Sequence, residues 1–368
     1  MNILLLNAYT TDSHSAWCKG LMQHLPQNTW TYLTLPGRHF SWRIRGNALS
    51  WAMGEARTSL EKPYDIVVAT SMVDLATLRG LVPNLANIPA VVYFHENQFA
   101  YPKNLQQHAS IEPQMVNLYS ALSAQTLLFN SQYNLSSLLD GAAQLLKKLP
   151  DQVPPGILKS IEEKSSILPV PINTASFSSG TDIAAKHHVM QPLHIIWNHR
   201  WEYDKGPELL QKVIELCRQD ELNLCFTIAG LRFRRVPKPF AELLATPPSC
   251  LVHMDSYPEK QQYHQALYKN HVVLSTAHHE FQGLAMLEGA AAGCIPLAPD
   301  RLAYPEWIPA HCLYANQQSL AAQAKSIITT LKHWQTQGLP HMIDVQKYTW
   351  PHMTQAYQTA FENATNQP

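Results

Sequence analysis

Two glutamates with seven residues between them stand out in the segment HHEFQGLAMLE. Glu280 and Glu288 enclose a run that is almost entirely apolar. A buried carboxylate is costly unless it has a partner, so the pair indicates a role beyond packing. The alternative interpretation is that Glu280 favours a helix N-terminus and Glu288 is a solvated helix residue. For this pair taken alone, the two interpretations are balanced.

The residues between the glutamates predict a loop followed by a helix, placed just after a predicted strand at residues 272–275. Gly283 lets the backbone approach a ligand, and the first free N–H groups of the helix, from Leu284 onward, form an anion site. Glu288 would then lie about a turn and a half into the helix, facing the same edge of the sheet.

Two cations follow another predicted strand, at residues 193–197. Arg200 and Lys205 lie in a loop that leads into a helix beginning near Pro207. Two cations at a sheet edge beside a helix N-terminus make a site for a diphosphate. The alternative is two unrelated surface cations, but the glutamate pair in the same half of the chain argues against that.

Together these residues resemble the retaining glycosyltransferases of the GT-B class. That family carries two Glu separated by seven residues, matched here by Glu280 and Glu288, and Arg, four residues, Lys, Gly, matched by Arg200, Lys205 and Gly206. The resemblance implies that Arg200 and Lys205 hold the donor diphosphate. It also implies that Glu288 holds the ribose hydroxyls and that Glu280 contacts the donor sugar near its anomeric carbon.

The resemblance further implies glycosyl transfer with retention at the anomeric carbon. Arg200, Lys205 and the helix start at Gly283 would stabilise the charge of the leaving diphosphate. The chain has no Asp-x-Asp triad of the metal-dependent class, so we expect neither a metal nor a cofactor. A double displacement with Glu280 as the nucleophile is not what the resemblance implies.

Polar residues also follow a predicted strand at residues 91–94 of the first half. His95 can donate a hydrogen bond to a sugar hydroxyl or to developing charge, and a catalytic part is expected for it. A structural, hydrogen-bonded histidine is the alternative. Glu96, Asn97 and Gln98 follow directly, and because a structural loop rarely needs four such groups in a row, contact with the sugar or the acceptor is favoured.

Cations alternate with aromatic residues between positions 38 and 45. Arg38, Trp42, Arg43 and Arg45 suit phosphate contacts combined with base stacking. The alternative is a solvated amphipathic segment. Two further basic clusters could join this one in a patch, although the sequence does not show that they share a face: Arg232, Arg234, Arg235 and Lys238, and Lys147 with Lys148.

Three segments of the first half resemble the tRNA-queuosine mannosyltransferase family, a branch of the same glycosyltransferases. They are LPGRHFSWRIRG, YFHENQFAYP and FNSQYN, and the second half adds TAHHEFQGLAMLE and DRLAYPE, so the likeness covers essentially the whole chain. It implies transfer of mannose from GDP-mannose to the cyclopentene-diol of queuosine in tRNA for aspartate. It also makes His14 and Asn130 candidate contacts for the sugar or the acceptor.

Two positions depart from the family pattern. Many relatives have a Gly-Gly pair in the loop after the first strand, where this chain has Asp12, although His14 keeps the histidine that follows that turn. Asp12 would be awkward beside a diphosphate, so the loop lies farther from the phosphates, contacts the acceptor, or turns Asp12 away. His199 stands before Arg200 where many relatives have glycine.

Short apolar runs alternate with amphipathic stretches, such as residues 207–218 and 259–268, that suit helices. Continuous apolar runs are typical of parallel strands buried on both faces. The predicted strands are 3–6, 66–69, 91–94, 126–129, 193–197, 224–229, 250–253, 272–275 and 294–298. The pattern predicts an α/β fold, and with the resemblance it indicates a GT-B fold, in which two Rossmann-like doubly wound domains face each other across a cleft.

We expect residues 1–172 to form the acceptor domain and residues 192–347 the nucleotide-sugar donor domain. Residues 173–191 are rich in Ser, Ala, Thr and His without apolar periodicity and are predicted to be a linker. Residues 348–368 carry apolar side chains at helical spacing and are predicted to form a helix that packs back on the first domain.

The composition indicates a soluble cytoplasmic protein with large cores. Apolar residues make up 46% of the chain, and its 27 basic and 27 acidic residues give no net charge, which disfavours a strongly electrostatic nucleic-acid or membrane binder. Six scattered cysteines fit free thiols in a reducing compartment. The first residues resemble a strand rather than a signal peptide, and no apolar run is long enough to span a membrane.

Two alternative functions are left open. One is a GT-B glycosyltransferase with a small-molecule, glycan or lipid-linked acceptor, and the other is a non-catalytic nucleotide-sugar or tRNA binder. The second predicts loss of donor-site residues, yet Arg200, Lys205, Glu280 and Glu288 are all present. The sequence does not identify the base or the sugar of the donor.

Overall fold

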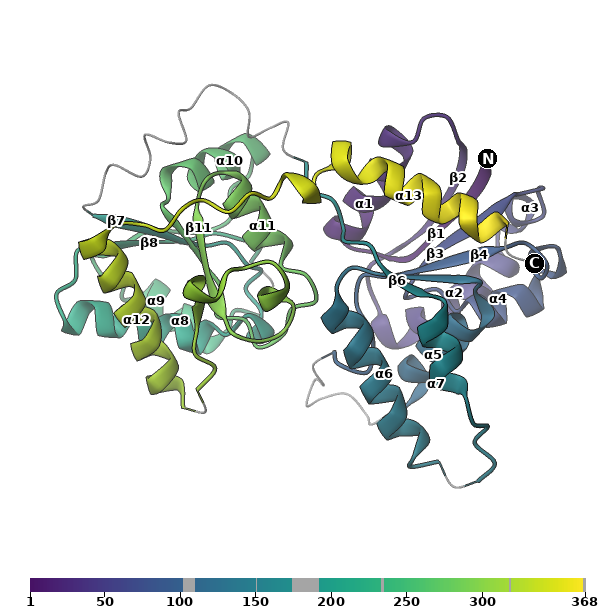
Figure 1. Ribbon diagram of the computed structural model, residues 1–368, viewed down its shortest axis with the longest axis horizontal. Coiled ribbons are helices and arrows are strands. Elements are labelled where there is room, and N and C mark those ends of the chain that lie inside the picture. The colour runs from purple at the N-terminus through teal and green to yellow at the C-terminus, as the bar shows by residue number, and fades with distance from the viewer. Residues whose placement is uncertain (102–109, 150, 174–191, 233–234, 318, 367–368) are drawn as a thin grey trace. The chain divides into compact units, whose positions relative to one another are not determined.

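The computed structural model describes residues 1–368 except 102–109, 150, 174–191, 233–234, 318 and 367–368. The chain divides into two compact units. The N-terminal unit is Met1–Pro171 with Trp350–Pro368, and the C-terminal unit is Ile172–Thr349. Each contains a six-stranded sheet with parallel strand pairing, and helices pack against it (Figure 1). The predicted α/β fold is confirmed.

The sheet of the N-terminal unit has the strand order β2-β1-β3-β4-β5-β6. Its strands are β1 Asn2–Thr10, β2 Thr29–Pro36, β3 Ile66–Thr70, β4 Ala90–Phe94, β5 Thr126–Phe129 and β6 Ser165–Ile167. Its helices are α1 Asp12–His24, α2 Phe40–Ala52, α3 Arg57–Leu60, α4 Leu75–Leu81, α5 Glu112–Ser123, α6 Gln132–Leu146, α7 Ile157–Glu163 and α13 Trp350–Thr365. The central strands β3 and β4 are buried along their whole length, so the core of this unit lies on both faces of the sheet.

The sheet of the C-terminal unit has the strand order β12-β11-β10-β7-β8-β9. Its strands are β7 Leu193–Trp197, β8 Leu224–Ile228, β9 Leu251–Met254, β10 Val272–Leu274, β11 Ile295–Pro299 and β12 Leu313–Tyr314. Its helices are α8 Pro207–Gln219, α9 Lys238–Ala245, α10 Lys260–Lys269, α11 Leu284–Ala291 and α12 Leu320–Gln337. The chain steps outward from β7 to β9 and then returns to the other side of β7 with β10, so the strand order reverses between β7 and β10.

Every strand predicted from a continuous apolar run is present, and all except the longer β1 match within one residue at each end. The strands that were not predicted are β2, β6 and β12, which all lie at sheet edges. An edge strand is covered on fewer sides, and β2 alternates threonine with larger residues and is only partly buried. The feature from which the strands were predicted, a continuous run of apolar residues, is therefore weakest in edge strands.

Helix α13 packs on the N-terminal unit, alongside α1 (Figure 1). The Trp17 indole donates to the Tyr357 hydroxyl at 3.0 Å, and that hydroxyl donates to the Pro169 carbonyl at 2.9 Å. Gly20 lies against the Trp350 ring, where a side chain on Gly20 would clash. The last helix of the chain thus completes the core of the first unit.

The loop after β1 gives Asp12 a local role. Thr11 caps α1 by accepting the N–H of His14, and Asp12 lies exposed in the first turn of that helix. A carboxylate is favourable there because the helix N-terminus carries partial positive charge.

No helix in the described part of the chain is long and apolar enough to cross a bilayer.

Candidate active site

The reversal of strand order places the predicted donor residues at one edge of the C-terminal sheet. In open parallel sheets, ligands bind beyond the C-terminal ends of the strands at such a switch point. Arg200 and Lys205 lie in the loop after β7, and Glu280 lies in the loop after β10. Since β7 and β10 are hydrogen-bonded neighbours, the fold brings these loops together.

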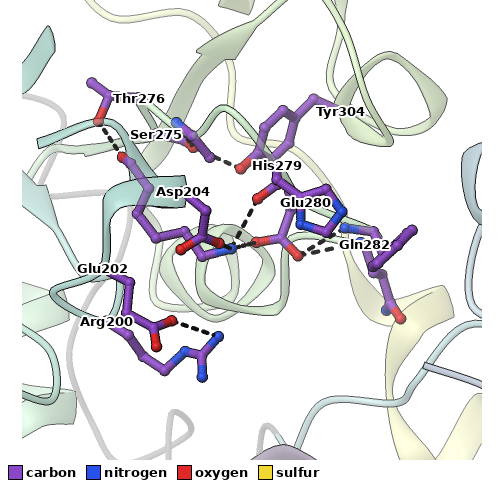
Figure 2. A network of polar contacts seen from close by, with 12 residues as sticks. Arg200, Glu202, Asp204, Ser275, Thr276, His279, Glu280, Gln282 and Tyr304 are labelled. Carbon is purple, nitrogen blue, oxygen red and sulfur yellow. Dashed lines mark hydrogen bonds and ion pairs between the residues drawn. The ribbon is translucent and has the colours of Figure 1, made fainter. Parts of the chain in front are cut away.

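Lys205 is buried at the centre of this edge. Its ammonium lies 3.3 Å from the Glu280 carboxylate and 3.1 Å from Asp204, and it donates to the His279 carbonyl at 2.9 Å (Figure 2). Burial alone would lower the pKa of Lys205, but Glu280 and then Asp204 raise it above its ordinary value. The lysine is therefore held charged between two carboxylates.

Glu280 is held ionised by the same contacts. Its second oxygen accepts the backbone N–H of Phe281 at 3.1 Å. Burial would raise the pKa of Glu280, but Lys205 and the neighbouring His199 and His279 lower it from 4.5 to about 2. The carboxylate is thus a fixed negative charge beside the lysine at neutral pH.

A threonine braces the two loops against each other. The Thr276 hydroxyl donates to the Lys205 carbonyl at 2.8 Å (Figure 2). It also accepts the Trp197 indole N–H at 2.9 Å. Gly206 has φ 67°, and a Cβ there would lie 2.0 Å from the Thr276 carbonyl oxygen. The glycine after Lys205 is needed because it allows this close approach.

Arg200 lies closer to solvent than Lys205. Its side chain is 42% exposed and forms an ion pair with Glu202 at 3.0 Å (Figure 2). The preceding residue, His199, is buried, and burial followed by the charge of Lys205 lowers its pKa to about 4. The histidine that replaces the family's glycine is therefore a neutral group among the site charges.

Glu288 lies on α11, as predicted, in a partly buried position. Its carboxylate accepts the Tyr263 hydroxyl at 2.8 Å, and burial raises its pKa. Tyr263 in turn accepts the Asn198 amide at 2.9 Å. The sequence did not identify either partner: Tyr263 lies inside an amphipathic helix pattern, and the only signal at Asn198 is its place directly after a strand.

Gly283 begins α11 with φ 87° and packs against the Tyr304 ring. The Tyr304 hydroxyl is 2.6 Å from the Ser275 hydroxyl at the end of β10 (Figure 2). The first N–H groups of α11, from Leu284 onward, therefore start at the same sheet edge as Lys205 and Glu280. Such N–H groups favour an anion, and together with the cations they suit a diphosphate.

A second polar cluster lies in the N-terminal unit. The His14 ring nitrogens lie 2.9 Å from the Glu96 carboxylate and 3.1 Å from the Tyr9 carbonyl oxygen. Glu96 also accepts the Ser71 hydroxyl at 3.1 Å. Both neighbours of the His14 ring are oxygen atoms, and together they fix the orientation of the ring.

The His95 ring contacts the His14 ring, with ring centroids 4.2 Å apart and the planes tilted by 35°, and it also contacts the rings of Trp17 and Tyr93. It is 7% exposed, and neither ring nitrogen has a hydrogen-bond partner among the described residues. Burial, followed by the charge of His14, lowers the pKa of His95 well below its ordinary value. A buried neutral histidine with two unused nitrogens is a strong candidate for a ligand contact.

Comparison with known proteins identifies the family of the chain. Residues 2–172 match a family model described as the N-terminal part of tRNA-queuosine alpha-mannosyltransferase. A tRNA-queuosine alpha-mannosyltransferase of Drosophila melanogaster is 34% identical over 325 residues, which cover 87% of this chain and 85% of that protein. The chain belongs to the tRNA-queuosine alpha-mannosyltransferase family.

Solved structures agree with the fold expected of that family. Sucrose-phosphate synthase of Thermosynechococcus elongatus matches with a TM-score of 0.70 at 12% identity, covering 99% of each chain. The catalytic domain of starch synthase IV of Arabidopsis thaliana matches with a TM-score of 0.69 at 12% identity, covering 100% of each chain. At such low identity these likenesses concern the fold, and they confirm the predicted GT-B fold.

Some residues predicted to contact the sugar or acceptor have supporting positions instead. Asn97 is fully buried, and its amide donates to Asn134 and Ser137, so the expectation of a direct contact was wrong for this residue. Asn130 is also buried and donates to the His95 carbonyl at 2.8 Å. Both amide nitrogens are engaged by groups of the protein itself, so these two side chains hold the loop after β4 in place.

Gln98 is half-buried beside this cluster. Its side-chain amide lies 3.7 Å from the Met72 sulfur, and its backbone N–H donates to Asn117. Because this side-chain contact is weak, it does not decide the role of Gln98, and contact with a ligand stays a prediction.

The cationic segment is not a uniform basic face. Residues 40–52 form α2, on which Arg43 is buried, whereas Trp42 is 53% exposed and Arg38, just before the helix, is exposed. Arg45 is paired with Asp74 at 2.6 Å and with Glu112 at 3.0 Å. Helical geometry separates Trp42, Arg43 and Arg45 because each step along α2 turns the side chain by about 100°.

The other basic clusters lie in different units. Arg232 lies over the Trp201 ring and Lys238 pairs with Glu242, both in the C-terminal unit, whereas Lys147 and Lys148 are exposed at the end of α6. Arg234 lies outside the described residues, as does most of the predicted linker. Among the described residues, no group of three or more His, Cys, Asp or Glu is arranged to hold a metal ion.

Proposed function

We propose that this protein transfers mannose from GDP-mannose to queuosine in tRNA for aspartate, with retention at the anomeric carbon. The observation that carries the proposal is the charged cluster of Lys205, Glu280 and Asp204 at the switch point, in a chain of the tRNA-queuosine alpha-mannosyltransferase family. The name of the Drosophila relative supports the choice of mannose and of queuosine.

In this reaction the bond between the anomeric carbon and the diphosphate oxygen breaks, and its electron pair goes to the diphosphate. Lys205, Arg200 and the N–H groups of the first turn of α11 would stabilise that charge. The acceptor hydroxyl attacks the same face of the sugar, and its proton goes to the departing diphosphate oxygen. Because the cations supply positive charge themselves, we propose a reaction that needs neither a metal nor a cofactor.

Glu280 is best suited to contact the sugar rather than to attack it. Its two oxygens are engaged by the Lys205 ammonium and by the backbone N–H of Phe281. A carboxylate with such a low pKa is a weak nucleophile but a good partner for positive charge that develops on the sugar.

The N-terminal unit supplies the groups proposed for the donor sugar or the acceptor. A neutral His95 both donates and accepts a hydrogen bond, as contact with a sugar hydroxyl requires. Glu96 holds His14, whose ring contacts that of His95. Exposed Arg38 and Trp42 suit a phosphate and a base of the tRNA.

We place the protein in the cytoplasm, where tRNA is found. All six cysteines are free thiols, which agrees with a reducing compartment.

The test is a mass measurement on tRNA. Purified protein is incubated with GDP-mannose and tRNA for aspartate that contains queuosine, and the nucleosides are then analysed by mass spectrometry. We expect queuosine to gain the mass of one hexose. The matched control is the same tRNA with guanosine in place of queuosine, which should gain none.

Further arms separate the alternatives. UDP-glucose and GDP-glucose replace the donor to test the base and the sugar, and EDTA tests independence of metal. Hydrolysis of GDP-mannose without a tRNA product would contradict the proposal that queuosine in tRNA is the acceptor. Binding of GDP-mannose or tRNA without turnover would indicate a non-catalytic binder.

A further inference from the structure

Three of the six cysteines lie close together at the N-terminal ends of β8 and β9, whereas the donor loops follow the C-terminal ends of β7 and β10. Cys217 lies in the last turn of α8, Cys225 is the second residue of β8, and Cys250 directly precedes β9. Phe226 on β8 pairs with Leu251 on β9, and the Phe226 N–H donates to the Cys250 carbonyl at 2.7 Å. The fold thus gathers cysteines that are scattered in the sequence.

A hydrogen bond joins the side chains of Cys217 and Cys250. Cys217 is buried, whereas Cys250 is half-buried. The thiol hydrogen of Cys217 has a second acceptor within reach, the Leu222 carbonyl oxygen at 3.7 Å. A negatively charged sulfur is the stronger acceptor of the two, so ionisation of Cys250 draws this hydrogen towards the Cys250 sulfur.

This hydrogen bond makes the two thiols differ in acidity. It lowers the pKa of Cys250 to about 7, with a smaller contribution from the charge of Arg218. The same bond, together with burial, raises the pKa of Cys217, and burial raises that of Cys225. Because the thiolate is the nucleophilic form of cysteine, Cys250 is the reactive member of the cluster near neutral pH.

The other three cysteines have different surroundings. Cys18, Cys294 and Cys312 are all buried. Burial raises the pKa of Cys18 to about 12 and that of Cys312 to about 11. The Cys294 sulfur lies 3.2 Å from the Leu267 carbonyl oxygen and 3.1 Å from that of Asn270. Buried structural thiols are inert, so these three serve as internal controls for reactivity.

We propose that Cys250 is a site of reversible oxidation by a hydroperoxide, with Cys217 as the thiol that resolves the oxidised sulfur to a disulfide. In the first step the Cys250 thiolate attacks a peroxide oxygen and the O–O bond breaks, which gives a sulfenic acid and a hydroxide that takes up a proton to form water. In the second step the Cys217 sulfur attacks the Cys250 sulfur and the S–O bond breaks. The oxygen leaves as water with the thiol proton of Cys217.

The balance of the reaction is simple. The two thiols lose two electrons and two protons in total, and hydrogen peroxide is reduced to two waters. A thiol reductant reverses the change by exchange through a mixed disulfide. Disulfides in reducing compartments are usually transient and redox-sensing, which fits a reversible bond between α8 and the start of β9.

The first test uses the wild-type protein. The full chain is treated with iodoacetamide at pH 7 for increasing times, and alkylation of each cysteine is followed by mass spectrometry. We expect Cys250 to react about 10-fold faster than Cys225, because a much larger fraction of it is ionised. The three internal controls should react only after unfolding. Equal rates for Cys250 and Cys225 would overturn the proposal.

The second test identifies the disulfide. The wild-type protein is treated with one equivalent of hydrogen peroxide, free thiols are blocked, and the chain is digested without reduction. We expect one linked pair of peptides, joined through Cys217 and Cys250, that separates when dithiothreitol is added. A disulfide between Cys225 and Cys250, a disulfide between two molecules, or no disulfide would contradict the proposal.

Cys217→Ala separates the two roles. Cys250 should still be oxidised but should stop at the sulfenic acid, which dimedone traps. The midpoint of its alkylation rate against pH should also move from about 7 towards the ordinary value for cysteine of about 8.5, because the hydrogen bond is lost. An unchanged midpoint would show that Cys217 does not activate Cys250.

Cys225→Ser is the matched control. It removes a neighbouring thiol but keeps the proposed pair, so the disulfide between Cys217 and Cys250 should form as in the wild type. Loss of that disulfide in Cys225→Ser would refute the assignment of Cys217. These measurements use no nucleotide sugar and no tRNA, so their outcome is independent of the proposed function.

Discussion

The Lys205 ammonium lies 3.3 Å from the Glu280 carboxylate, and both side chains are largely buried. Each charge needs the other, because an unpaired charge in such a position is destabilising. Asp204 is a second carboxylate beside the lysine. The buried cation Lys205 therefore lies between two carboxylates, those of Glu280 and Asp204. Arg200 is the more exposed of the two cations proposed to bind the diphosphate.

Lys205→Ala should weaken GDP binding and turnover by about 10- to 100-fold, because one diphosphate charge loses its partner. The substitution should also lower the melting temperature, since Glu280 and Asp204 are left without their cation. Calorimetry and a hexose-transfer assay measure the first effect. Lys212→Ala, on the surface of α8, is the control and should change neither. If Lys205→Ala had the kinetics of the wild type, the diphosphate would not bind at this position.

The pH dependence of stability should report Glu280. Its pKa in the folded protein is lowered to about 2, so its contribution is present above pH 4.5 and is lost as the pH falls towards 2. The shift corresponds to a contribution on the order of 3 kcal/mol. Glu280→Gln should therefore be less stable than the wild type at pH 6, and the difference should narrow by pH 3. A difference in unfolding free energy that is the same at both pH values would contradict this coupling.

His95→Ala should separate chemistry from donor binding. The residues proposed to bind the diphosphate all lie in the C-terminal unit, so the affinity for GDP should stay within about 2-fold while turnover falls about 100-fold. His311→Ala, at an exposed position, is the control. Because burial keeps His95 neutral, its ring signals in NMR should not titrate between pH 6 and pH 8. Unchanged turnover in His95→Ala would show that His95 has no part in catalysis and serves only in packing.

Arg38 and Arg45 should behave differently although both belong to the predicted cationic segment. Arg38→Ala should weaken tRNA binding and reduce the dependence of log affinity on log salt by about one. Arg45→Ala should leave the salt dependence unchanged and lower the free energy of unfolding by about 0 to 1 kcal/mol, because it removes partly exposed ion pairs. If both variants reduced the salt dependence of tRNA binding equally, Arg45 would contact tRNA in spite of its ion pairs, and the prediction would be wrong.

The sequence predicted the main elements, and it predicted that the candidate donor residues lie in loops at a sheet edge or on the helix that follows, because those features are local. Arg200, Lys205, Glu280 and Glu288 each follow a strand that a short apolar run identifies, and their spacing matches a known family. Asn198 and Tyr263 were not identified, since their significance arises from a hydrogen bond between residues 65 positions apart. A pattern along the chain carries no information about such a contact.

The same reasoning explains the corrections in the N-terminal unit. His95 and Asn97 are both polar residues in one short loop, and the sequence treats them alike. Only the packing distinguishes them, because the Asn97 amide nitrogen finds acceptors on α6 whereas the His95 ring nitrogens find no partner among the described residues. The burial of Arg43 and the ion pairs of Arg45 likewise depend on which way α2 faces.

Helix α13 gives the protein an order of assembly. Trp350 and Tyr357 fill the core against Gly20 and Trp17, yet they are translated after the whole C-terminal unit. A ribosome that has reached Thr349 has made every strand of both sheets but has left the N-terminal unit with an open apolar surface. The first unit to be synthesised is thus the last to be finished, and the groups around His95 reach their final packing only when the end of the chain arrives.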